Sequence, residues 1–172
     1  ELSAQTTVVK TITGAGDDKA GSSVMLSRNG SCFIYGATGK YSSKGEAYVY
    51  CLEASTWQLK HTLNSASSTD AEQDFGFSVA INSDANYVAV GARFHDYDSK
   101  VNNGVVMVFN ISGASATQVG KTISGERGES DLSSNNYYVG DEFGFSLALS
   151  DTLADGTIRV AIGGPKNDNS AT

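Results

Sequence analysis

Short apolar runs alternate with polar and turn residues along the whole chain, and this pattern predicts strands. The runs are rich in β-branched and aromatic residues and are bounded by glycine, asparagine and serine. No stretch of a dozen residues keeps the apolar stripe that an amphipathic helix needs. The sequence therefore predicts an all-β fold.

One apolar segment occurs twice almost unchanged and marks the start of a sequence repeat. Phe75–Ala80 reads Phe-Gly-Phe-Ser-Val-Ala, Phe143–Ala148 differs from it by one residue, and Ala20–Met25 is a weaker copy. A polar turn and a second apolar run follow each copy. The second run ends in a glycine step, which is Gly36-Ala37-Thr38, Gly91-Ala92-Arg93 or Gly163-Gly164-Pro165.

Each complete repeat predicts four consecutive strands joined by short turns, which is an antiparallel meander. The expected strands span 21–26, 31–35, 46–51 and 56–63 in the first repeat, and 76–81, 87–90, 104–110 and 117–123 in the second. The third repeat supplies 145–149 and 157–162. Residues 7–14 have the pattern of a fourth strand, so we expect them to end a preceding repeat.

Repeats of this length, each a four-stranded meander, are typical of β-propeller blades. The expected organisation is the last strand of a preceding blade over 1–15, then blades over 16–70 and 71–140, and the first half of a third blade over 141–172. A propeller needs at least about four blades to close, so the ring is expected to be incomplete in this chain. Either the protein continues or several copies share a ring.

The repeats resemble FG-GAP repeats, the units of the integrin α-subunit β-propeller and of many extracellular proteins. The resemblance rests on the paired motifs, as in Phe143-Gly144 followed by Gly163-Gly164-Pro165, and it covers nearly the whole chain. It implies a secreted or cell-surface scaffold or adhesion module that binds other proteins or glycans. Further copies or the missing blades of the same protein are also expected partners.

Charge and composition narrow the classes of partner. The net charge of the 172 residues is −7 and no cluster of Lys and Arg is present, so a nucleic-acid partner is not expected. No apolar run approaches the roughly 20 residues that a membrane span needs, so membrane insertion is not expected either. No cofactor is expected.

The loop between the first two strands of a blade carries a calcium-binding motif in some members of the FG-GAP family. In repeat three, Asp151 and Asp155 fall at the first and fifth positions of such a loop, but Leu153 and Arg159 stand where further ligands would be. Two carboxylates are too few for tight binding, and Arg159 repels a cation. A plain hairpin turn is favoured over a calcium site.

A second polar loop has no counterpart in repeat one. It contains His95, Asp96, Asp98, Asn102 and Asn103, which are oxygen ligands grouped with one imidazole. The interpretations are a weak cation site, a surface for a polar partner, or a solvated loop, which we favour. The polar linker 124–140 is also unrepeated.

The two cysteines and two sequons bear on the compartment. Cys32 and Cys51 fall at the edges of consecutive antiparallel strands, so a cross-strand disulfide and two separate thiols are both open. A disulfide would favour secretion. Asn29 and Asn110 begin Asn-x-Ser triplets for N-glycosylation, although about two such triplets are expected by chance in this composition.

The sequence contains no recognisable catalytic constellation. His61 occupies a repeat position filled elsewhere by Lys10 and Lys121, and no nucleophile elbow or zinc-protease motif is present. Asp17-Asp18 and Asp141-Glu142 are interpreted as exposed turn residues. We therefore expect a non-catalytic module. The alternative is the propeller part of a secreted enzyme whose active site lies at the axis or in another domain.

Overall fold

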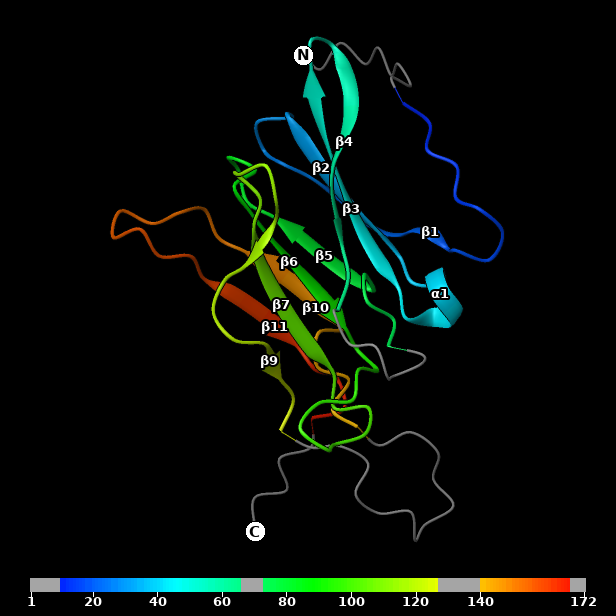
Figure 1. The fold of residues 1–172 in the computed structure, drawn as a ribbon. Helices are drawn as coiled ribbons and strands as arrows, with labels where there is room; N and C mark the ends of the chain where they lie inside the picture. Colours follow the sequence, from blue (N-terminus) through cyan, green and yellow to red (C-terminus); the bar gives the residue numbers. More distant parts are fainter. Residues whose placement is uncertain (1–9, 66–72, 127–139, 168–172) are drawn as a thin grey trace, which may run out of the picture.

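The computed structural model describes residues 10–65, 73–126 and 140–167. They form three antiparallel sheets that follow one another in chain order (Figure 1). The all-β expectation is confirmed, and none of the sheets closes into a barrel within the described residues. Those residues contain no helix long and apolar enough to cross a membrane.

Sheet 1 is a four-stranded meander in the order of the sequence. Its strands are β1 (Ala20–Leu26), β2 (Cys32–Ala37), β3 (Glu46–Glu53) and β4 (Thr56–Leu63). The turn between β1 and β2 is held by Asn29, whose Oδ1 accepts hydrogen bonds from the Ser31 backbone N–H at 2.9 Å and from the Ser31 hydroxyl at 2.7 Å. A short helical segment, α1 (Lys40–Ser43), links β2 to β3.

Sheet 2 repeats this order with one difference from the expected strands. It contains β5 (Ser78–Ile81), β6 (Tyr87–Ala92), β7 (Val105–Asn110), β8 (Thr117–Gln118) and β9 (Ile123–Ser124). The continuous fourth strand expected over 117–123 is wrong, because β8 and β9 pair separately with β7. Gly120 lies between them at φ +71°, a conformation that interrupts a strand.

Sheet 3 consists of two paired strands, β10 (Ser146–Leu149) and β11 (Val160–Gly163). β11 begins three residues later than the expected start at 157, because Asp155 draws Thr157 into the hairpin turn. Of the expected opening strand over 7–14, residues 10–14 are not in a strand and residues 7–9 lie outside the described residues.

Two hydrophobic cores join the three sheets. The first lies between sheets 1 and 2 and includes Ile34 and Val49 from sheet 1 with Val88 and Val90 from sheet 2, all completely buried. The second lies on the opposite face of sheet 2, where the fully buried Ala80, Ala89 and Val106 meet the apolar side chains of sheet 3. Sheet 2 is therefore packed on both faces.

The repeated glycines form the joint between successive sheets. A Cβ on Gly36 would collide with the carbonyl oxygen of Gly76, and a Cβ on Gly91 would collide with that of Gly144. The Ser23 hydroxyl donates to the Gly76 carbonyl at 2.7 Å, and the Ser78 hydroxyl donates to the Gly144 carbonyl at 2.6 Å. Because a glycine has no side chain, Gly36 and Gly91 let the backbone at the start of the next sheet approach closely. The serine hydroxyl then holds that backbone by a hydrogen bond.

Candidate functional site

The candidate loop 95–103 connects β6 to β7 at one end of the sheets, which we call the loop end. The segments that enter β5 and β10 lie at the same end, since Phe143 donates its backbone N–H to the Asn103 carbonyl at 3.2 Å. The hairpin that carries Asp151 and Asp155 lies at the opposite end, called the hairpin end. The carboxylates named as metal candidates are therefore divided between two distant places.

Hydrogen bonds within loop 95–103 occupy most of its predicted binding residues. Asp96 Oδ1 accepts from the Asn102 backbone N–H at 2.7 Å, and His95 Nδ1 donates to the Asp96 carbonyl at 2.7 Å. Asn103 Oδ1 accepts from the Tyr97 N–H at 3.0 Å, while its amide donates to the Gly125 carbonyl at 3.1 Å. These side chains shape the loop.

The loop divides into a buried base and an exposed tip. His95 is 4% exposed and Asn103 is completely buried, whereas Tyr97 is 37% exposed and Asp98 is also exposed. A partner approaching from solvent would meet the tip first. Binding by the base residues themselves stays a prediction.

An arginine surrounded by phenylalanines lies beside this loop and was not identified from the sequence. The Arg93 guanidinium lies 3.9 Å from the ring centre of Phe77 and 4.2 Å from that of Phe94. Phe145 packs against Phe77 at 5.1 Å and is 40% exposed. We call these four residues the Arg93 cluster. It places a cation and an exposed aromatic ring on the same surface.

Arg93 also takes part in a set of ion pairs found in all three repeats. Each pair joins a carboxylate before the first strand of a sheet to a cation after the second strand. The pairs are Asp18–Lys40 at 3.0 Å, Asp74–Arg93 at 3.1 Å and Glu142–Lys166 at 2.7 Å. The hydrogen bond from Lys40 lowers the pKa of Asp18. The pairs are a feature of the scaffold at the loop end.

The interpretation of Asp141-Glu142 as exposed turn residues is wrong. Asp141 is 1% exposed and Glu142 is 7% exposed. The backbone of Gly140 lies against Asn102 in the loop of sheet 2, and Glu142 forms an ion pair with Lys166. Burial of a carboxylate is tolerated there because it is paired.

At the hairpin end, Asp151 and Asp155 make hydrogen bonds within turns. Asp151 Oδ1 accepts from the Ser83 backbone N–H at 2.9 Å, which joins the turns of sheets 2 and 3. Asp155 Oδ1 accepts from the Thr157 N–H and hydroxyl. These hydrogen bonds lower the pKa of both carboxyls. The arrangement is that of a hairpin, and calcium binding there stays a prediction.

No group of three or more His, Cys, Asp or Glu side chains is placed to share a metal ion in residues 10–65, 73–126 and 140–167. Asp96 and Asp98 belong to one loop, but the Asp96 carboxylate already caps Asn102. Most of the linker 124–140 lies outside the described residues.

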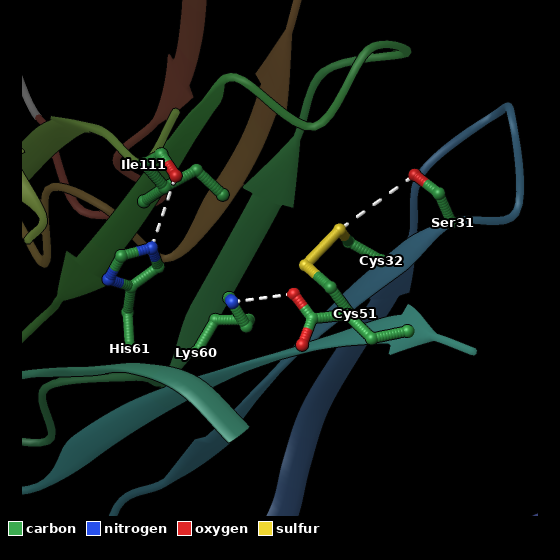
Figure 2. Close-up of polar contacts among 7 residues, drawn as sticks. Ser31, Cys32, Cys51, Lys60, His61 and Ile111 are labelled. Atoms are coloured by element: carbon green, nitrogen blue, oxygen red, sulfur yellow. Dashed lines mark hydrogen bonds and ion pairs between the residues drawn. A yellow bond between two sulfur atoms is a disulfide. The ribbon is translucent and has the colours of Figure 1, made fainter. Parts of the chain in front are cut away.

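Cys32 and Cys51 face each other on β2 and β3 and form a disulfide. Figure 2 shows this bond together with His61, which reaches from β4 to the Ile111 carbonyl in sheet 2. The His61 Nε2–Ile111 O distance is 3.1 Å, and His61 is 7% exposed. The imidazole thus links two sheets.

The two sequons adopt the same local geometry. The Oδ1 atoms of Asn29 and Asn110 each accept from the backbone N–H and the hydroxyl of the serine two positions later. Asn29 is exposed and Asn110 is half-buried. Their modification stays a prediction.

No protein-family model matches the sequence, and no curated protein matches it significantly. The function must therefore be argued from the residues and their geometry.

The outer face of sheet 1 carries a stack of aromatic rings that the sequence reasoning also missed. Phe33 stacks on Tyr50 at 5.4 Å, and Tyr35 stacks on Tyr48 at 5.1 Å. Trp57 meets the edge of Phe33 at 4.9 Å. The alternation of Phe33-Ile34-Tyr35 and Tyr48-Val49-Tyr50 contains the signal, because alternate residues of a strand share a face.

Proposed function

We propose that this chain is a non-catalytic, extracellular β-propeller segment that acts as a scaffold or adhesion module. In this proposal the loop end binds other proteins or glycans. The observation that carries it is that the repeated residues make structural contacts, whereas unrepeated residues lie on the surface at the loop end. The repeated glycines and serines join the sheets, and the repeated ion pairs link the segments that flank the first two strands of each sheet. Loop 95–103, by contrast, is an unrepeated surface feature, and the Arg93 cluster lies beside it where repeats two and three meet.

The chemistry of the loop end suits a polar or mixed surface. Tyr97 and Phe145 offer aromatic area, Arg93 offers a cation, and Asp98 offers a carboxylate. Aromatic rings beside hydrogen-bonding and charged groups are common in protein interfaces. The disulfide supports an oxidising compartment, which is where the proposal places the protein.

A binding screen with the immobilised chain tests this proposal. The probes are a glycan array and a panel of extracellular protein domains. We expect at least one partner, and we expect Tyr97→Ala with Asp98→Ala to weaken its binding at least about tenfold, as loss of interface anchors does. Asp84→Ala, at an exposed position of the hairpin end, is the matched control and should leave binding unchanged.

Two results would contradict the proposal. One is the absence of any protein or glycan partner together with turnover of a substrate, which would favour the propeller part of an enzyme. The other is a partner whose affinity responds to Asp84→Ala but not to the loop variant.

A further inference from the structure

The turn between β1 and β2 holds an Asn-Gly pair in a geometry that brings two reactive groups together. Asn29 Oδ1 accepts from the Ser31 backbone N–H at 2.9 Å, which closes a hydrogen-bonded ring. The side-chain amide carbon of Asn29, Cγ, and the backbone nitrogen of Gly30 are both members of this ring. They are therefore held close to each other, and a bond between them would form a succinimide.

The surroundings of Asn29 leave this cyclisation open. Asn29 is exposed, and a Cβ built on Gly30 meets nothing within 4 Å, so no side chain screens the Gly30 nitrogen. The hydrogen bonds that hold the Asn29 side chain to Ser27 and Ser31 are all accepted by Oδ1, which leaves Nδ2 able to depart. The Gly30 N–H donates to the Ser27 carbonyl at 2.8 Å, but this bond lies in a surface turn, where local opening costs little.

The turn between β10 and β11 already holds an aspartate in the same geometry. Asp155 Oδ1 accepts from the Thr157 backbone N–H at 3.0 Å and from its hydroxyl at 2.6 Å, as Asn29 Oδ1 accepts from Ser31. The glycine between them has φ +80° in this turn and φ +71° in the turn of Asn29. A carboxylate in place of the Asn29 amide would therefore keep the hydrogen bonds of its turn.

Two other asparagines each lack one of these conditions. Asn103 also precedes a glycine, but it is completely buried and its amide donates to the Gly125 carbonyl at 3.1 Å. Asn110 closes the same ring with the Ser112 N–H at 2.9 Å, but the next residue is Ile111, whose β-branched side chain crowds the nitrogen. Asn29 alone among these three combines exposure, the ring and a following glycine.

From these observations we infer that Asn29 is a site of spontaneous deamidation in the folded protein, with water as the co-reactant. The Gly30 nitrogen loses its proton and bonds to Asn29 Cγ, the Cγ–Nδ2 bond breaks, and Nδ2 leaves as ammonia. Water then opens the succinimide at either of its carbonyls and leaves aspartate or isoaspartate at this position. No atom is oxidised or reduced, and the turn gains a negative charge.

Deamidation would have consequences for this turn. In the Asn29 sequon a glycan would be attached to Nδ2, the atom that leaves as ammonia, so deamidation and glycosylation exclude each other. Isoaspartate, unlike aspartate, adds a carbon to the main chain of the turn, where the Asn29 N–H donates to the Ser83 carbonyl of sheet 2 at 3.4 Å. The site lies at the hairpin end, so this inference is independent of the binding role proposed for the loop end.

The test compares the two Asn-Gly pairs of the sequence, which begin at Asn29 and Asn103, in the folded and the denatured chain. The protein is incubated at mildly alkaline pH with and without guanidinium chloride. Peptide mass spectrometry follows the conversion of each asparagine to aspartate and isoaspartate. In denaturant the two should convert at similar rates, because only the Asn-Gly sequence acts there. In the folded chain Asn29 should convert at least about tenfold faster, because Asn103 reacts only when the base of its loop opens.

Two variants carry the direct product of deamidation and test whether the fold accepts it. Asn29→Asp should keep the circular dichroism spectrum and the denaturation midpoint of the wild type, because Asp155 is held in the same way in its own turn. Asn103→Asp is the matched control and should lower the midpoint. A carboxylate at that buried position cannot donate to the Gly125 carbonyl.

Two results would overturn the inference. The first is an equal rate of conversion for Asn29 and Asn103 in the folded chain, which would mean that both react only after unfolding. The second is an Asn29 that converts in denaturant but not in the folded protein, which would mean that the turn protects it. A lowered midpoint for Asn29→Asp would contradict the claim that the turn accepts the product.

Discussion

At the scale of single residues, the glycine steps matter for the space they leave. Gly36 and Gly91 occupy equivalent positions, and each lies against the backbone of a glycine at the start of the next sheet, Gly76 or Gly144. A side chain at either position would push two sheets apart. Their recurrence in the sequence is explained by backbone contact between neighbouring sheets.

We expect Gly36→Ala to lower the free energy of unfolding by about 1–3 kcal/mol, the usual range for overpacking a filled site. The added methyl group would collide with the Gly76 carbonyl, which belongs to backbone and cannot turn away. Chemical denaturation followed by circular dichroism measures the change. Gly113→Ala is the matched control, since its nearest neighbour would be 3.6 Å away. Equal effects of the two substitutions would contradict the role of the joint.

Tyr35 should contribute to the pH dependence of stability. Burial, and then the neighbouring Tyr50, raises the pKa of Tyr35 to about 12, from about 10 in an unfolded chain. The unfolded chain therefore loses this proton first as the pH rises. The contribution is complete below about pH 10 and is lost progressively between about pH 10 and 12.

Denaturation of the wild type and of Tyr35→Phe between pH 9 and about pH 12 checks this expectation. The free energy of unfolding should fall less steeply with pH in the variant. Tyr97→Phe, at a 37% exposed position of the loop tip, serves as the control. Parallel curves for wild type and Tyr35→Phe would contradict the argument.

At the scale of elements, the strands are short and owe their order to pairing and to cross-links. The disulfide joins β2 and β3 at the hairpin end, where Cys32 and Cys51 are direct partners in the register. His61 then connects β4 to sheet 2. The disulfide thus stabilises the pairing within sheet 1, and the His61 hydrogen bond links sheet 1 to sheet 2.

Reduction of the disulfide should destabilise the chain by about 3 kcal/mol, the value typical of a closed loop near this size, here 19 residues. Denaturation with and without a reductant measures the difference. The Cys32→Ala, Cys51→Ala double variant is the control, because the reductant should have no effect on it. A wild type whose stability is the same in both conditions would rule out a stabilising bridge.

At the scale of the whole molecule, the three sheets behave as one stack because they share cores. Phe75 is completely buried in the core between sheets 1 and 2. Its backbone N–H donates to the Lys44 carbonyl at 3.0 Å, so the segment that enters sheet 2 is fixed to the start of β3. Unfolding of one sheet should therefore expose the other.

We expect sheets 1 and 2 to unfold in one transition, and Phe75→Ala to lower its free energy by about 3–5 kcal/mol. Fluorescence of Trp57, the single tryptophan, reports sheet 1, and hydrogen exchange of β6 reports sheet 2. The two probes should give coincident transitions in both proteins. Phe145→Ala, at a 40% exposed position, should have a much smaller effect. Separate transitions would mean that the sheets are independent.

The sequence alone determined the features that depend on neighbouring residues. Alternation of apolar and polar residues identified the all-β class and most strands, and the Asn-Gly turn and glycine steps gave the spacing of the repeats, because turns and strand faces are set by local backbone preferences. It also identified loop 95–103 as unrepeated. The break between β8 and β9 escaped it, since Gly120 follows a run that reads as one strand.

Only the tertiary structure decided what the repeated and unrepeated residues contact. The Arg93 cluster, the burial of Glu142 and the joint between Gly36 and Gly76 bring together residues from different strands and repeats. Such contacts depend on how the sheets stack, which no local pattern contains. The same stacking buried Val79 and Ala89 in sheet 2, whereas Val24 and Ala161, at the equivalent positions of sheets 1 and 3, are exposed.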